Sequence, residues 1–143
     1  HNDIFDGLRD HLLPRFDQGF SALIEDLDQR GMLETTLVVC MGEFGRAPIV
    51  ALEPRFAGAL PGRKHWSSVY SIAFAGAGVR RGTILGASDD RGAWPTDQAW
   101  GPWDVTATIF SALGIDPSQH YRDPVERPIR ISDGNVMSAL YTG

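Results

Sequence analysis

The stretch TTLVVCMGEFGRAP, residues 35–48, decides the fold, and its apolar part ends abruptly in a carboxylate, Glu43. Residues 35–42 are apolar and β-branched without polar alternation, which is typical of a central strand covered on both faces. An amphipathic helix pattern precedes them, and a helix followed by such a strand indicates an α/β layer fold. We therefore expect Glu43 at the carboxyl end of a strand, where ligand sites gather in open α/β sheets.

The helix expected upstream spans residues 8–27, where apolar residues recur at three- and four-residue steps. We expect one face of it to be buried. Pro14 interrupts the apolar stripe, so either the helix kinks there or a short helix ends and a longer one begins with proline in its first turn. Gly31 stands where glycine commonly ends a helix.

Downstream of Glu43 the pattern predicts loops, strands and a second helix. Residues 43–66 are rich in proline and glycine without a helical period, which predicts a long loop. Residues 68–78 and 82–88 indicate two strands joined by a short turn and therefore antiparallel neighbours. A helix is expected over residues 102–115, and the tail is expected to hold a short strand and a last helical turn.

Composition excludes several classes of function. With 143 residues, 43% of them hydrophobic, the chain is long enough for one domain with a core and too short for two. The formal net charge is −5 and no block of lysine and arginine stands out, which disfavours nucleic-acid binding. No apolar run approaches the roughly 20 residues of a membrane span. The chain begins at His1 rather than Met, and we expect it to be a fragment of a longer protein.

A candidate site follows from the expected strand pairing. If residues 68–75 run antiparallel to residues 36–41, the start of the later strand lies at the same sheet edge as Glu43, which brings His65 toward that carboxylate. A carboxylate and an imidazole with cations alongside suit a divalent metal ion and an anionic oxygen group. Alternatively, Glu43 caps a turn or pairs with Arg46, and His65 bonds to backbone. Spacing alone leaves both interpretations open.

Four segments resemble, in order and spacing, the DUF1501 family of the alkaline phosphatase/sulfatase-like superfamily. They are RGMLETTLVVCMGEFGRAP at 30–48, GRKHW at 62–66, FAGAGVRRGTILGASDDRGAWP at 74–95 and DVTATIFSALGIDP at 104–117. The resemblance implies that residues 1–143 are the carboxy-terminal part of one such domain. It implies a three-layer α/β/α sandwich with a mixed sheet, incomplete in this fragment, and a bacterial protein that is periplasmic or secreted.

The resemblance also implies a set of site residues. In the superfamily, an acidic residue and a histidine at the end of a strand supply two metal ligands, and a later histidine supplies another. By this likeness Glu43, His65 and His1 are metal ligands, and the divalent ion is zinc, calcium or manganese. Phe44 stands where the paired histidine would be, and Lys64 where the family commonly has aspartate. The nucleophile is expected earlier in the parent chain.

Two functions follow from these expectations. The first is metal-dependent hydrolysis of a small phosphate or sulfate ester, in which Arg46 and Lys64 stabilise the anionic group. The second is a relative without catalysis that binds an anionic ligand in the same pocket, a sulfated glycan or a partner protein. Phe44 favours the second, because phenylalanine cannot ligate a metal. A purely structural module ranks below both.

Four tryptophans fall around the expected site loops, where packing ranks ahead of stacking on a sugar as their role. They are Trp66, Trp94, Trp100 and Trp103.

Overall fold

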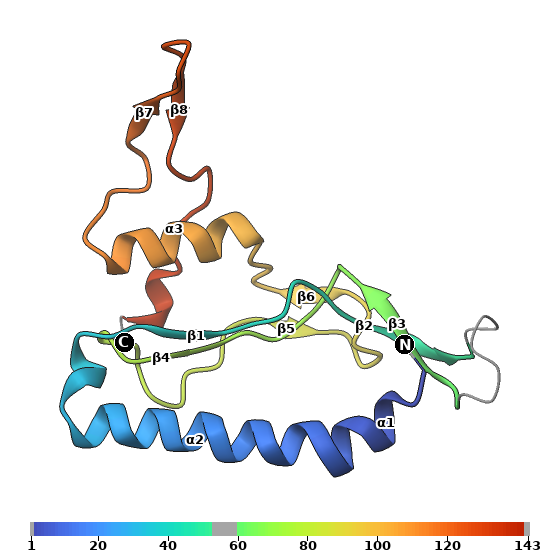
Figure 1. Cartoon of the computed structure of the whole chain (residues 1–143). Helices are drawn as coiled ribbons and strands as arrows, with labels where there is room; N and C mark the ends of the chain where they lie inside the picture. Colours follow the sequence, from blue (N-terminus) through green and yellow to red (C-terminus); the bar gives the residue numbers. More distant parts are fainter. Residues whose placement is uncertain (1, 53–59, 142–143) are drawn as a thin grey trace.

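The computed structural model describes residues 2–52 and 60–141, which form a mixed α/β fold. A long helix, α2 (Leu13–Gln29), lies along one side of a layer of short strands, and the shorter α3 (Pro102–Ala112) lies on the other side (Figure 1). In this described part of the chain the strands pair two by two, and all four pairs are antiparallel. The expected α/β class is therefore confirmed.

The first helical segment is continuous but changes its winding. α1 (Ile4–Asp6) passes into η1 (Gly7–Leu12), a π-helical stretch, which passes into α2. Pro14 is the second residue of α2, directly after the π-helical stretch, so it lies inside a continuous helical segment, where its missing N–H removes one helical hydrogen bond. Of the two alternatives for Pro14, the structure has proline in the first turn of the longer helix, but the preceding helical segment does not end before it. Gly31 follows α2 with a φ of 68°, a left-handed conformation that glycine adopts readily.

The apolar stretch that decides the fold forms a short strand. After η2 (Met32–Glu34), a 3₁₀ turn, β1 (Val38–Cys40) pairs antiparallel with β4 (Ala73–Ala75), and Val38 lies opposite Ala75. This pairing confirms the antiparallel relation that we expected. However, β1 is half-buried along its whole length, so the expectation of full cover on both faces is wrong for this structure.

The predicted long loop at residues 43–66 contains two strands. β2 (Gly45–Ala51) pairs antiparallel with β3 (Gly62–Trp66), with an irregular register around Pro48. Proline cannot donate to a ladder and is tolerated at such irregularities, which explains why the sequence looked like a loop. Gly45 is required at the start of β2, because the carbonyl of Val69 lies directly where a Cβ would stand.

The two strands predicted at residues 68–78 and 82–88 do not pair with each other. β4 bonds to β1, whereas β5 (Ala87–Ser88) bonds to β6 (Pro95–Asp97). The chain between β4 and β5 turns repeatedly through glycines with left-handed φ, which separates the two strands. These glycines are Gly76, Gly78, Gly82 and Gly86.

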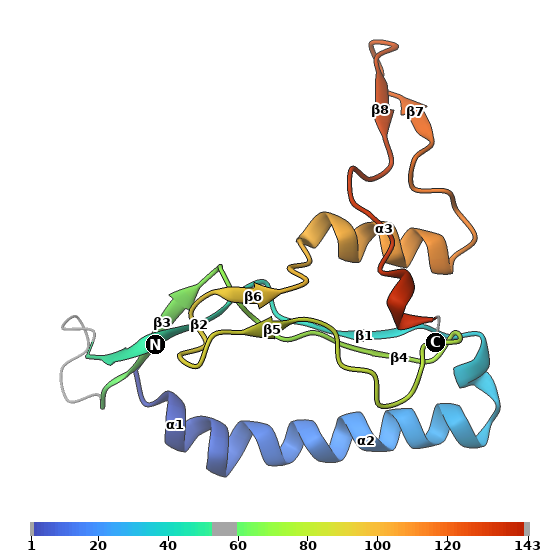
Figure 2. The ribbon, with the colours of Figure 1, turned by 180° about the vertical axis from the view of Figure 1, so that it is seen from behind.

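The carboxy-terminal part combines a predicted helix with an unexpected arm. α3 matches the predicted helix, and Gly114 follows it with a φ of 76°. β7 (His120–Arg122) and β8 (Pro128–Arg130) then form a hairpin that projects away from the body in both views (Figures 1 and 2). The expected short strand and last helical turn are β8 and η3 (Ser138–Leu140).

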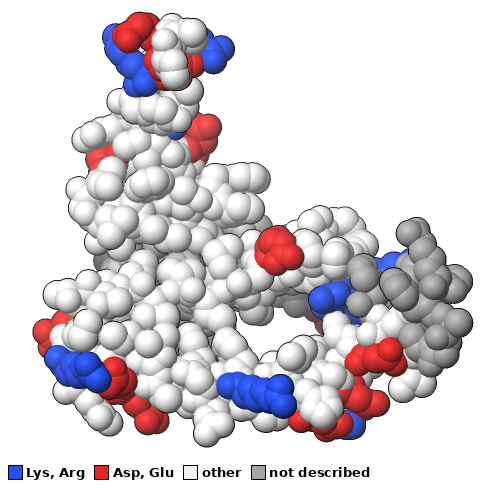
Figure 3. All heavy atoms as spheres, in the orientation of Figure 1, with Lys and Arg blue, Asp and Glu red and all other residues white. Residues whose placement is uncertain are grey.

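The buried core is small and lies between α3, η3 and the strand layer. Val105, Met137 and Leu140 are buried together, and Phe74 of β4 packs against them. In contrast, no side chain of α2 is buried, and a cavity of about 1290 Å³ separates this helix from the strand layer. Figure 3 shows the hollow between them. Within the described residues, no helix is long and apolar enough to cross a membrane.

Candidate functional site

The β2–β3 pair brings Arg46 and His65 together. They lie directly opposite each other in the ladder, so their side chains share one face of the pair, with Cβ atoms about 4.5–5.5 Å apart. The Arg46 guanidinium also donates a hydrogen bond of 3.4 Å to the carbonyl of Arg63. Because strand side chains alternate, Arg63 shares the face of His65. We call this surface, Arg46, Arg63 and His65, the paired face.

Phe44 covers one side of the His65 ring. The ring centroids are 3.8 Å apart and the planes are inclined by 31°. The residue that replaces the expected histidine is therefore in contact with the other ligand candidate. Stacking fixes the orientation of the imidazole, but its two nitrogens lie at the edge of the ring, outside the stacked surface.

Glu43 is exposed just before β2 and lines the large cavity together with Ser67 and Ser68. In residues 2–52 and 60–141, no group of three or more His, Cys, Asp and Glu side chains is placed to hold a metal ion. His1, the third ligand that we expected, lies outside the described residues. The metal set of Glu43, His65 and His1 therefore stays a prediction.

Lys64 lies on the other face of β3. Since successive side chains of a strand point to opposite faces, Lys64 shares its face with Trp66, whereas His65 shares its face with Arg63. The two cations that we expected at one anion, Arg46 and Lys64, are thus separated by the strand. Their shared role stays a prediction.

The beginning of the described chain is anchored beside β3. The N–H of Asp3 donates to the carbonyl of Leu60 at 3.1 Å, and the N–H of Leu60 donates to the Asp3 carboxylate at 2.7 Å. The Arg63 guanidinium lies 6.0 Å from the centre of the Phe5 ring. The paired face therefore adjoins the N-terminal segment.

Arg63 is the residue of this face that the sequence did not single out. Its Nε is buried, and in the described part of the chain it has no hydrogen-bond partner. Buried donors are nearly always satisfied in native proteins, so such a group suits an acceptor oxygen supplied by a ligand. Recognising GRKHW as a strand would have placed Arg63 beside His65 from the sequence.

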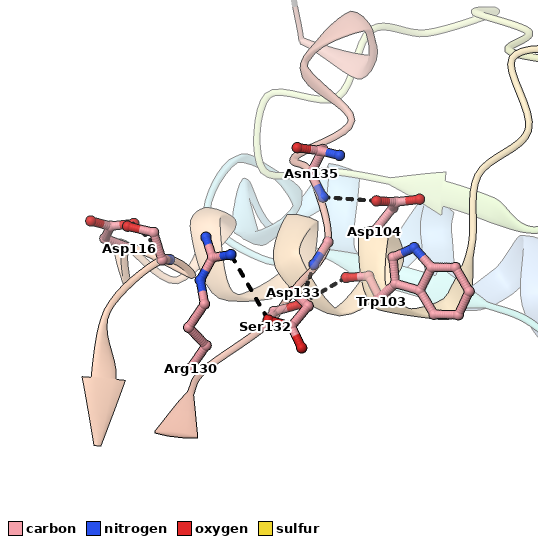
Figure 4. Close-up of polar contacts among 9 residues, drawn as sticks. Trp103, Asp104, Asp116, Arg130, Ser132, Asp133 and Asn135 are labelled. Carbon is pink, nitrogen blue, oxygen red and sulfur yellow. Dashed lines mark hydrogen bonds and ion pairs between the residues drawn. The ribbon is translucent and has the colours of Figure 1, made fainter. Parts of the chain in front are cut away.

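Asp104 and Thr108, which lie in the segment 104–117 that carries the resemblance, are structural in this chain. The Asp104 carboxylate accepts hydrogen bonds of 2.7 Å from the N–H groups of Gly101 and Asn135. The Thr108 hydroxyl donates to the Asp104 carbonyl at 2.7 Å and accepts from the Met137 N–H at 2.9 Å. These bonds tie the tail to α3, as the Asp104–Asn135 contact in Figure 4 illustrates.

Comparison with protein families gives a match over nearly the whole chain. The model described as "Protein of unknown function (DUF1501)" matches residues 1–141. No curated protein and no solved structure matches the chain. The matched range includes the β2–β3 pair, α3 and the tail.

Proposed function

The chain belongs to the DUF1501 family of proteins of unknown function, and from this premise we propose that it carries the anion-binding face of a metal-dependent hydrolase of phosphate or sulfate esters. The proposal places the family in the alkaline phosphatase/sulfatase-like superfamily, with a three-layer α/β/α sandwich. The positions of α2 and α3 on opposite sides of the strand layer support that architecture. A periplasmic or secreted location belongs to the same proposal.

The paired face carries the proposal. An N–H group removed from water without a partner costs about 1–3 kcal/mol, and an anionic oxygen bound at the Arg63 Nε would offset that cost. The guanidinium groups of Arg46 and Arg63 are planar and permanently charged, which suits them to the oxygens of a phosphoryl or sulfuryl group. His65 lies opposite Arg46 in the ladder and two positions after Arg63 in β3.

The ligand types that the resemblance implies suit a divalent metal ion. Glu43, His65 and His1 offer one carboxylate and two imidazoles, a ligand set that zinc and manganese accept. Such an ion, when bound, withdraws electrons from an ester oxygen and lowers the pKa of a bound water. The chain's own residues have two other roles. Phe44 fixes the plane of the His65 imidazole, and Arg46 counters the negative charge that develops on the oxygens of the transferred phosphoryl or sulfuryl group.

A second function, anion binding without catalysis, is favoured by the stacked pair of Phe44 and His65. In this pair a ring that cannot ligate a metal occupies the place of the expected second histidine. On this alternative the paired face holds an anionic ligand, a sulfated glycan or an acidic surface of a partner protein. On this alternative Arg46 and Arg63 contribute to affinity alone.

The test combines turnover with metal analysis on the full protein. Aryl phosphate and aryl sulfate are offered with added zinc, manganese or calcium. We expect Arg46→Gln to lower kcat by about a hundredfold, as loss of a donor at a developing charge does. We expect His65→Ala and Glu43→Ala to abolish bound metal as well as turnover. His11→Ala, an exposed histidine on η1, is the matched control and keeps both.

The outcomes separate the two functions. Sulfate binding that Arg46→Gln and Arg63→Gln weaken, without turnover under any metal, establishes the binding alternative and refutes the hydrolase. Wild-type protein that binds neither metal nor sulfate refutes both.

A further inference from the structure

The hollow between α2 and the strand layer (Figure 3) has a wall that is apolar and aromatic over much of its extent. Its volume is about 1290 Å³, whereas pockets for small molecules typically measure about 300–1,000 Å³. Ile24 lines the hollow from α2, and Ile72 lines it from the chain before β4. Phe74 and Trp100 also line it, and both pack against the buried core, which holds their rings in place. The wall therefore suits the apolar body of a ligand.

The charged side chains along this wall are predominantly negative. Five carboxylates and two guanidinium groups line the hollow, which leaves a formal charge of −3. The carboxylates are those of Glu25, Asp28, Glu34, Glu43 and Asp97, and the guanidinium groups are those of Arg80 and Arg81. Arg81 forms an ion pair of 2.8 Å with Asp28. In the described part of the chain, the other four carboxylate groups have neither an ion pair nor a hydrogen bond.

The complement of this wall is an extended ligand with a positive charge. An ammonium group is attracted to the carboxylates, and an anion is repelled by them. The rings of Phe74 and Trp100 add to this preference, because the face of an aromatic ring attracts a cation. Among residues 2–52 and 60–141, no three acidic, histidine or cysteine side chains are grouped to hold a metal ion. The carboxylates therefore favour an organic cation over a small inorganic one.

We propose that the hollow binds a cationic amphiphile, a primary ammonium group on a long alkyl chain. The chain lies along the wall that includes Ile24, Ile72 and Phe74, and the ammonium group lies at the carboxylates of the rim. A fatty acid of the same length has the apolar chain but the wrong charge, and a short amine has the charge but little of the chain. The site shares only Glu43 with the proposed hydrolase and does not depend on that activity.

Calorimetric titration of the chain with decylammonium, below the concentration at which it forms micelles, tests the proposal. We expect saturable binding of decylammonium. Decanoate, which has a chain of the same length and the opposite charge, is expected to bind at least tenfold more weakly. Butylammonium is also expected to bind at least tenfold more weakly, because it buries six fewer methylene groups.

The carboxylates are tested with a pair of double variants that change the net charge equally. Glu25→Gln with Glu34→Gln is expected to weaken decylammonium binding severalfold, as the loss of two exposed charge contacts does. Asp17→Asn with Asp90→Asn is the matched control, since both residues are exposed and neither lines the hollow. The control is expected to leave the affinity unchanged. Circular dichroism verifies that each variant is folded.

The hollow itself is tested by filling it. Ser71 is exposed on its wall, and Ser71→Trp is expected to weaken decylammonium binding at least fivefold, because the new ring occupies space that the alkyl chain needs. Ser21→Trp is the matched control on the part of α2 that does not line the hollow, and it leaves the affinity unchanged.

Three outcomes overturn the proposal: absence of decylammonium binding, equal binding of decanoate, and equal losses in a variant and its control. Ester turnover without decylammonium binding refutes this site alone. Decylammonium binding without ester turnover supports this site and refutes the hydrolase alone.

Discussion

At the scale of single residues, two threonines on α3 make the same local contact with different consequences. Thr106 donates to the Pro102 carbonyl at 2.9 Å on an exposed surface, whereas Thr108 is fully buried and donates to the Asp104 carbonyl at 2.7 Å. Only Thr108 also accepts a hydrogen bond, from the N–H of Met137. Of the two threonines, Thr108 is therefore the one whose hydroxyl connects the tail to α3.

We expect Thr108→Val to lower the free energy of unfolding by about 1–3 kcal/mol, because it leaves the buried N–H of Met137 without an acceptor. Thr106→Val is the matched control and is expected to change stability by less than about 0.5 kcal/mol. Urea unfolding measures both. Equal losses in the two variants would show that the contact to Met137 does not stabilise the tail.

For α3 and the tail, the sequence indicated the segment that is important but not the hydrogen-bond partners of its residues. Asp104 and Thr108 lie in a segment that carries the resemblance, but their partners include backbone N–H groups about 30 positions later, which no side-chain pattern reveals. At the paired face the sequence-based prediction failed for a different reason. Lys64 and His65 were expected at one site because residues 62–66 were not recognised as a strand, and in a strand their side chains point to opposite faces.

At the scale of elements, the β7–β8 hairpin is stabilised at its tip by Asp123. Hydrogen bonds from the Arg127 backbone N–H, its guanidinium and the Val125 N–H hold the pKa of the Asp123 carboxyl below its usual value. A carboxyl with a lowered pKa in the folded state stabilises above its ordinary pKa. That contribution is lost as the pH falls through the lowered value.

We therefore expect the hairpin amides to exchange faster with solvent as the pH falls below about 4, beyond the change in intrinsic exchange rate. Exchange measured by NMR at a series of pH values provides the test. In Asp123→Asn the carboxyl is gone, and the extra acid dependence is expected to disappear. An acid dependence that persists in this variant would assign the effect to another group.

Elements whose apolar residues follow a clear local pattern were predicted from the sequence. Elements that depend on contacts between distant segments were not. The helices and β1 follow local apolar patterns, and the β1–β4 pairing followed from chain order. The β2–β3 pair was missed because Pro48 and glycines obscure strand periodicity. The β5–β6 pair was missed because the sequence pattern of residues 82–88 indicates a strand but not its partner. The glycines between β4 and β5 turn the chain so that β5 lies beside β6 and not beside β4.

At the scale of the whole molecule, the chain exposes more surface than its size predicts. Its accessible surface is 10138 Å², whereas a monomeric protein of this mass exposes about 7,300 Å². The excess includes apolar side chains of η1 and α2 that the amphipathic pattern predicted to be buried. Leu12, Phe16 and Leu23 of this stripe are between 46% and 60% exposed, and the neighbouring Leu13 is 49% exposed.

We expect the isolated chain to bind the dye ANS strongly at neutral pH, because dyes of this kind report exposed apolar surface. The double variant Leu13→Gln with Phe16→Gln is expected to lower the dye fluorescence clearly. Leu113→Gln, which changes a single leucine that is 69% exposed beyond α3, is the control with little effect. Weak dye binding by the unaltered chain would show that α2 packs more closely in solution.

The hollow beside α2 also has a mechanical consequence. The helix is joined to the rest through α1 and β3 at one end and through η2 at the other, with the Asp28–Arg81 ion pair of 2.8 Å near the second end. Its 17 residues span about 25 Å. We therefore expect α2 to move as a rigid rod. A displacement of the N-terminal segment against β3 would then shift η2 and the start of β1 along the helix axis, without any change in the buried core.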